Sequence, residues 1–130
     1  MSNTFLRLAV LFALVGVSLG YWMGVTQQFG LSPVHAHINL LGWASMFLYG
    51  LFYRAFPRAG EGLLPKLHLG LAAVGLPVMM LGLTIKLAPI PSLLALEAPM
   101  LMGGPTLILL GMVVFAFIVF KATDAKAAVI

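Results

Sequence analysis

The stretch from His35 to Pro57 reads HAHINLLGWASMFLYGLFYRAFP and is apolar almost throughout, yet it opens with two histidines and an asparagine. Ionisable groups are costly inside a membrane-spanning helix, so they mark a candidate functional site by default. Imidazole is also a common metal ligand. The stretch is therefore predicted to be a membrane-spanning helix that carries a ligand site, with the rest of the chain arranged around it.

The composition of the whole chain is that of a membrane protein. Of its 130 residues, 62% are hydrophobic and only 8% are charged, and the mean hydropathy is +1.13. Soluble domains are nearer to about 45–50% apolar and about 25% charged. Cysteine is absent, which excludes disulfides, thiolate metal sites, iron–sulfur clusters and covalently attached c-type haem. The basic residues lie singly, so the net charge of +4 does not indicate a nucleic-acid partner.

Four apolar segments of spanning length are predicted, at approximately 5–26, 34–56, 66–87 and 100–120. The first also has features of a secretory signal peptide, but its spanning length favours a retained helix. Residues 89–99 are expected to form a longer connection with a short interfacial helix at 92–96. Residues 1–130 are thus predicted to form one domain, an all-α four-helix transmembrane bundle.

The basic residues predict the orientation of this bundle. Every Lys and Arg except Lys86 falls at one end of it. By the positive-inside rule both termini are cytoplasmic, and we expect a multi-pass protein of the bacterial inner membrane. His35 and His37 then lie near the outer face and His68 near the inner face, on the order of 30 Å away. Within one chain, His68 is therefore expected to be a separate, interfacial residue.

The two histidines of the His-Ala-His motif are predicted to point to opposite sides of their helix. Residues two apart are about 200° apart, because each residue turns the helix by about 100°. Asn39 and Gly42 follow His35 on its face. Asn39 is placed to hydrogen-bond a ligand histidine, and Gly42 allows a flat ring or a neighbouring helix to approach closely. The alternative for both histidines is a partly solvated position at the helix end.

A longer motif follows the histidines: Leu41-Gly42-Trp43, Met46, Gly50, Tyr53 and Pro57. With His35-Ala-His37 it resembles the tenth helix of haem-copper oxidase catalytic subunits, most closely those of C-type (cbb) oxidases and nitric oxide reductases. The likeness continues into the family's eleventh helix with Lys66-x-His68, Gly75, Met79 and Gly82-Leu83. The resemblance implies that the four segments correspond to helices nine to twelve. It also implies that His35 and His37 ligate haem b on opposite faces of the helix.

The chain departs from this family in size. The family's copper ligands and cross-linked tyrosine lie on helices without a counterpart here, so the chain is not a complete oxidase, and whether it is an enzyme stays open. The family's twelve helices form three similar arcs of four, so a homotrimer would imitate that ring. Each haem would then be held by His37 of one protomer and His35 of the next. The resemblance implies electron transfer, with a redox partner or quinol, or binding of O2 or NO.

Two further residues, Trp43 and Lys86, complete the predicted haem-binding set. Lys86 would pair with a haem propionate, and a propionate is also the alternative partner of Asn39. Otherwise Lys86 is a snorkelling lysine at a helix end, or it pairs with Glu97 in a purely structural contact. One alternative function is copper handling, because thioethers and imidazoles select Cu(I). Its ligands would be His35, His37 and the outer methionines. The other alternative is a structural membrane subunit without a cofactor.

Overall fold

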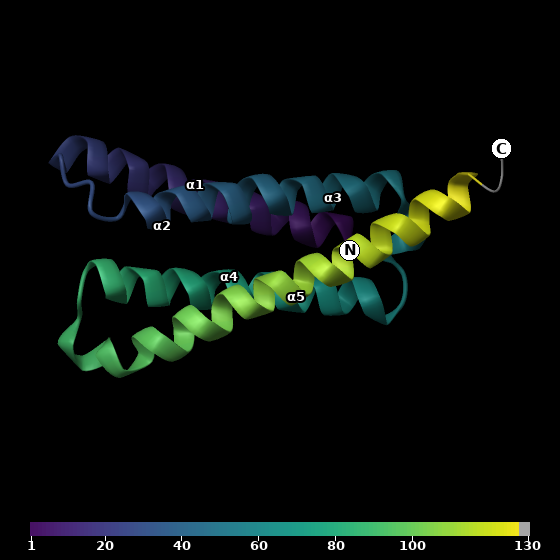
Figure 1. Ribbon diagram of the computed structural model, residues 1–130. Helices are drawn as coiled ribbons and strands as arrows, with labels where there is room; N and C mark the ends of the chain where they lie inside the picture. The colour runs from purple at the N-terminus through teal and green to yellow at the C-terminus, as the bar shows by residue number, and fades with distance from the viewer. Residues whose placement is uncertain (128–130) are drawn as a thin grey trace.

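The computed structural model describes residues 1–127, with side chains as far as residue 124. The chain begins with the long helix α1, Ser2–Thr26, and turns back through a short loop. A second helical segment follows as α2 (Ser32–His37), the π-helix η1 (Ile38–Ser45) and α3 (Met46–Ala55). His37 and Met46, at the two junctions, keep α-helical backbone angles. The three pieces therefore form one continuous helical segment, which packs against α1 (Figure 1).

The second half of the chain forms another hairpin. A 3-10 turn η2 (Pro57–Gly60) leads into α4 (Leu63–Leu87). A second 3-10 turn η3 (Pro91–Leu93) leads into α5 (Leu94–Ala127). Helices α4 and α5 pack along each other, and the pair lies beside the first hairpin (Figure 1). The described residues are helices and short turns, without a strand.

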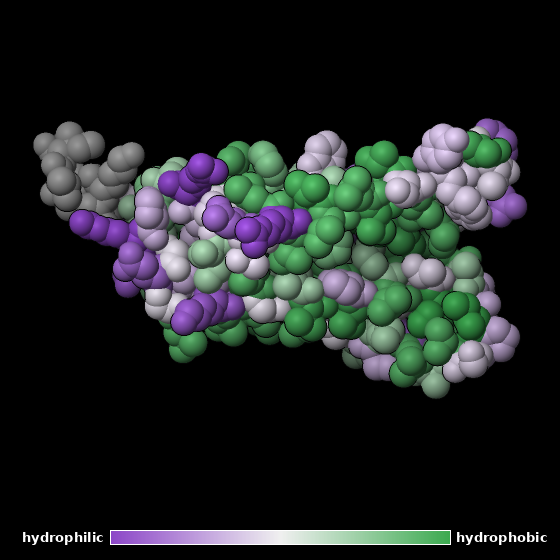
Figure 2. Space-filling view, turned by 180° about the vertical axis from the view of Figure 1, so that it is seen from behind, coloured by the Kyte–Doolittle hydropathy of each residue, from purple (hydrophilic) through white to green (hydrophobic). Residues whose placement is uncertain are grey.

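Three of these helices are long and apolar enough to cross a membrane. They are Ser2–Thr26, Leu63–Leu87 and Pro91–Asp124, with mean hydropathies of 2.0, 1.8 and 2.3. Hydrophobic side chains cover the middle of the face shown in Figure 2, and hydrophilic ones lie at its two ends, with the larger group at one of them. Many large apolar side chains are exposed on the outside of the molecule, such as Leu14, Val17 and Leu109. This surface is that of an all-α membrane protein.

The start of the last helix corrects the prediction for residues 89–99. Instead of a longer connection with a separate short helix, the chain makes the η3 turn and enters α5 at Leu94, so that Pro99 lies inside the helix. Proline inside a helix frees a carbonyl, and membrane helices tolerate this because neighbouring groups and local adjustments satisfy it. Of the prolines that suggested a connection, Pro99 is thus accommodated within the helix, whereas Pro89 and Pro91 lie before it.

Glycines set the distance between α4 and α5. A Cβ atom added at Gly104 would meet the backbone of Met79, with the Met79 Cα at 2.6 Å. A Cβ at Gly75 would lie 3.0 Å from the Ile108 nitrogen. Small residues allow membrane helices to approach backbone to backbone, where packing rather than the hydrophobic effect holds them together. The α4–α5 hairpin is therefore closed by contacts that no larger residue could make.

Candidate functional site

A π-helix follows directly after His37. In η1 the helix widens, and the Ser45 hydroxyl donates a hydrogen bond of 2.8 Å to the carbonyl of Leu40, five residues earlier. π-Helical turns are rare and occur frequently at functional sites. This one begins beside His37 and includes Asn39 and Gly42. Local geometry therefore points to the same turns as the histidine motif does, although the sequence carries no signal for a π-helix.

His35 is fixed against α1 by a backbone carbonyl. Its Nδ1 lies 2.8 Å from the carbonyl oxygen of Gly16. A carbonyl can only accept, so Nδ1 must carry the hydrogen, and Nε2 of the neutral ring is left with a free lone pair. The Asn39 amide donates to the His35 carbonyl at 2.8 Å, and its nitrogen lies 3.3 Å from the ring Nδ1. Asn39 thus holds the backbone turn of His35 and lies next to its ring.

His37 is held in the same way, but within its own helix. Its Nδ1 donates to the carbonyl of Pro33 at 2.7 Å, which again leaves Nε2 without a hydrogen. Neither Nε2 has a hydrogen-bond partner among the described residues, and no buried side-chain nitrogen or oxygen there lacks one. Both half-buried rings therefore present Nε2 at an accessible surface. His35 hydrogen-bonds to α1, whereas His37 hydrogen-bonds within its own helix.

Two glycines of α1 form the surface on which His35 and Asn39 rest. A Cβ at Gly20 would lie 2.6 Å from Cε1 of His35, and one at Gly16 would lie 2.7 Å from Oδ1 of Asn39. Small residues four apart line one face of a helix and admit a neighbour closely. These two glycines are not among the residues that the sequence motif singled out. Their spacing of four residues could have identified them, because it places both on one face of α1.

Replacing Gly20 by alanine is expected to lower the free energy of unfolding by about 1–2 kcal/mol, because the methyl group displaces the His35 ring. Gly24→Ala on the same helix is the matched control, since a Cβ there meets nothing within 4 Å. It should leave stability unchanged or raise it by up to about 1 kcal/mol through helix propensity. Unfolding in mixed micelles measures both, and equal effects would show that Gly20 does not support His35.

The other predicted site residues lie apart from the two rings. Gly42 is buried between helices, and a Cβ there would be 2.7 Å from Phe12 and 3.0 Å from Leu76. Trp43 is 47% exposed. Lys86 is paired with Glu97 at 3.5 Å, the structural contact that the sequence offered as an alternative. Gly42 therefore admits a neighbouring helix in this structure.

The expectation that His68 is an interfacial residue is wrong. Its exposed fraction is 1%, and its Nδ1 lies 2.9 Å from the Tyr53 hydroxyl. Rings of Phe5, Tyr49 and Phe115 surround it, with centroids 5.0, 4.6 and 4.9 Å away. The sequence could not show this, because the cover comes from α1, α3 and α5. These three helices meet α4 only in the folded protein.

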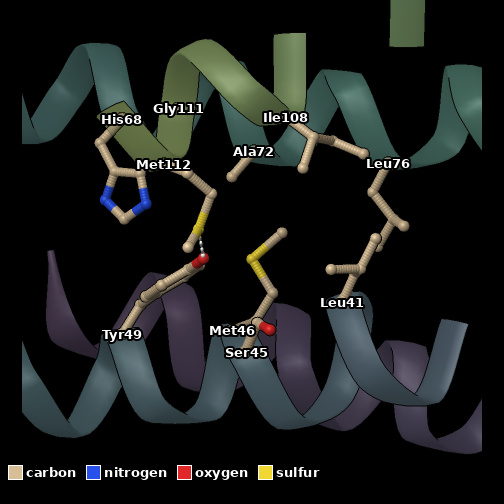
Figure 3. A pocket seen from close by; sticks show the side chains of 10 residues that line it. All are labelled: Leu41, Ser45, Met46, Tyr49, His68, Ala72, Leu76, Ile108, Gly111 and Met112. Carbon is tan, nitrogen blue, oxygen red and sulfur yellow. Dashed lines mark hydrogen bonds between the residues drawn. The ribbon is translucent and has the colours of Figure 1, made fainter. Parts of the chain in front are cut away.

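A small cavity of about 20 Å³ lies next to His68. Figure 3 shows that its lining comes from several helices, with Tyr49 from α3, His68 from α4 and Met112 from α5. The cavity is large enough for roughly one water molecule. Its lining extends along the middle of the bundle, from His68 to Leu76 on α4, and neither His35 nor His37 lines it. His68 is therefore not part of the His35 and His37 site.

Metal ligands do not gather in one place within the chain. Among residues 1–127, no group of three or more His, Cys, Asp or Glu side chains is arranged to hold a metal ion. Comparison with family models finds no match, and comparisons with curated proteins and with solved structures likewise find none. The case for a function therefore depends on the two histidines and their surroundings.

Proposed function

We propose that this protein is a four-span haem b protein of the bacterial inner membrane with both termini in the cytoplasm. His35 and His37 are its iron ligands. The observation that carries this proposal is the shared state of the two imidazoles. In each, Nδ1–H is bound to a backbone carbonyl and Nε2 is accessible with a free lone pair. Ligand histidines in metal and haem sites are oriented in this way, by a hydrogen bond from the other ring nitrogen.

The four-span topology is supported by the second helical segment. Ser32–Ala55 is interrupted only by its own π-helical turn, and it runs alongside α1 over the same length of the molecule (Figure 1). The basic residues Arg54 and Arg58 lie at its far end, towards the same end as both chain termini. The positive-inside rule places that end in the cytoplasm. The two histidines then face the outer leaflet.

Two chains are needed to give one iron two histidine ligands. His35 is bound to α1, whereas His37 hydrogen-bonds within its own helix, and the two rings leave that helix on different sides. We infer a homotrimer in which His37 of one protomer and His35 of the next hold each haem. A closed ring of identical contacts is a normal form of oligomer. It would also reproduce the twelve-helix ring of the haem-copper oxidases that the sequence resembles.

Bound haem would supply one-electron transfer or, with one coordination position open, the binding of O2 or NO. The role of the protein is to orient the ligands. The carbonyls of Gly16 and Pro33 fix the two rings, and Asn39 fixes the helix turn of His35. Trp43 is exposed on the same helical segment, two turns beyond the histidines, and is not part of the ligand set. A propionate would have to compete with Glu97 for Lys86.

Purified protein is expected to show a reduced-minus-oxidised spectrum of low-spin haem b, quantified by the pyridine haemochrome. His35→Ala and His37→Ala should each weaken haem binding at least about tenfold, because each removes an axial ligand. Ala36→Ser, between the two histidines, is the matched control and should keep the wild-type spectrum. Wild-type spectra in both histidine variants would refute the assignment. Protein that stays colourless after haem addition and contains copper would instead identify a copper-binding protein.

Co-expression of the two histidine variants separates shared sites from sites within one chain. In a mixed oligomer, a His35→Ala chain still supplies His37 and a His37→Ala chain still supplies His35. Mixed samples should therefore regain part of the low-spin signal that neither variant shows alone. A monomer by light scattering that retains bis-histidine haem would refute the trimer and leave the haem assignment standing.

A further inference from the structure

A large hollow lies away from the histidines, at the end of the protein that the proposed orientation places in the cytoplasm. Its volume is about 590 Å³, and it is bounded by the end of α3, the η2 turn, the start of α4 and the last turns of α5. Its walls are mostly apolar and include Phe56, Leu64 and Ile118. Arg58 and Lys121 also line it, together with Glu61. The hollow thus joins an apolar wall to a charged lining.

The two cations in this hollow are not neutralised by the protein. The one ion pair among the described residues is Lys86–Glu97, at the other end of the molecule. Glu61 therefore pairs with neither Arg58 nor Lys121, and the three charges leave an excess of one positive charge. An unpaired guanidinium favours phosphate, which it can bind through two parallel hydrogen bonds. The lining thus suits a ligand with a single negative charge.

The position of the hollow identifies the kind of anion. Its lining belongs to the ends of three apolar helices, α3, α4 and α5, and helix ends lie at the level of lipid phosphates in a bilayer. Basic pockets between membrane helices on the cytoplasmic side bind anionic lipid headgroups. We propose that this hollow binds an anionic phospholipid. Arg58 and Lys121 hold its phosphate, and an acyl chain lies along Phe56, Leu64 and Ile118. This site is independent of haem binding.

The test is a titration of the purified, detergent-solubilised protein with phosphatidylglycerol, with phosphatidylcholine of the same acyl chains as the neutral comparison. Native mass spectrometry measures the bound lipid. We expect phosphatidylglycerol to bind at least about tenfold more tightly, and the double variant Arg58→Gln/Lys121→Gln to lose about tenfold in affinity. Arg54→Gln/Lys66→Gln is the matched control. It removes the same charge at the same end, from exposed residues that do not line the hollow.

A second variant separates a pocket from a charged surface. Ala122→Trp fills the hollow and keeps every charge, so it should also release the lipid. The proposal is overturned if the control pair loses as much affinity as the lining pair, or if phosphatidylcholine binds as tightly as phosphatidylglycerol. It is also overturned if Ala122→Trp binds like the wild type. Displacement of the lipid by millimolar inorganic phosphate would show a free-phosphate site and would overturn the lipid assignment.

Discussion

Replacement of His68 by alanine is expected to lower the free energy of unfolding by about 2–4 kcal/mol. Two effects add. The buried Tyr53 hydroxyl loses its partner at 2.9 Å, and an unpaired buried polar group costs about 1–3 kcal/mol. The aromatic rings of Phe5, Tyr49 and Phe115 also lose the ring on which they pack, which adds the cost of a cavity. Reversible unfolding in mixed micelles, followed by helical circular dichroism, measures the sum.

The neighbouring residue provides the matched control for this variant. Leu67 is 46% exposed on the same helix, and Leu67→Ala should cost far less than His68→Ala because its side chain is already exposed on the outside of the bundle. Tyr53→Phe tests the hydrogen bond separately and should cost about 1–3 kcal/mol. A loss of stability in His68→Ala no larger than that of Leu67→Ala would contradict the buried position of His68.

The second large effect is expected at the α4–α5 contact. Gly104→Ala should destabilise the protein by about 2–3 kcal/mol, because its new methyl group meets the backbone of Met79 rather than a movable side chain. The two helices must separate to admit it. Gly103→Ala, at the adjacent residue, is the matched control, since a Cβ there meets nothing within 4 Å. It should be neutral or stabilising by up to about 1 kcal/mol.

Thermal unfolding of the two glycine variants compares their stabilities directly. A separated hairpin should also expose α5 to limited proteolysis in Gly104→Ala and leave it protected in Gly103→Ala. Equal stability and equal protection in the two variants would show that α4 and α5 are not in backbone contact at Met79.

Hydropathy predicted three of the helices well, because an apolar run of spanning length is visible in the sequence without knowledge of what packs against it. The predicted segments 5–26 and 66–87 fall within α1 and α4, and 100–120 falls within α5. The error near Pro99 arose because proline was taken as a boundary, whereas a packed membrane helix can contain it. The predicted segment 34–56 also ends within one residue of the end of α3 at Ala55, just before the η2 turn.

Features that depend on two helices at once could not be predicted in the same way. The cover over His68 comes from aromatic residues of three other helices. His35 is held by the carbonyl of Gly16, and a backbone carbonyl cannot be recognised from the residue types in the sequence because every residue has one. The His-Ala-His motif and Asn39 could be singled out because polar residues are unusual in an apolar helix. The neighbours that orient them became visible only in the fold.

The wide turn of η1 determines in which direction the side chains of α2 point relative to those of α3. The end at His35 and His37 and the end at Tyr49 and Tyr53 belong to the same continuous segment, joined through Ile38–Ser45. Removing one residue from this turn would rotate one end against the other by about 100°. If Tyr53 stayed on His68, His35 would leave the glycines of α1. Helix register alone therefore ties the outer histidines to the buried histidine at the far end, without any contact between them.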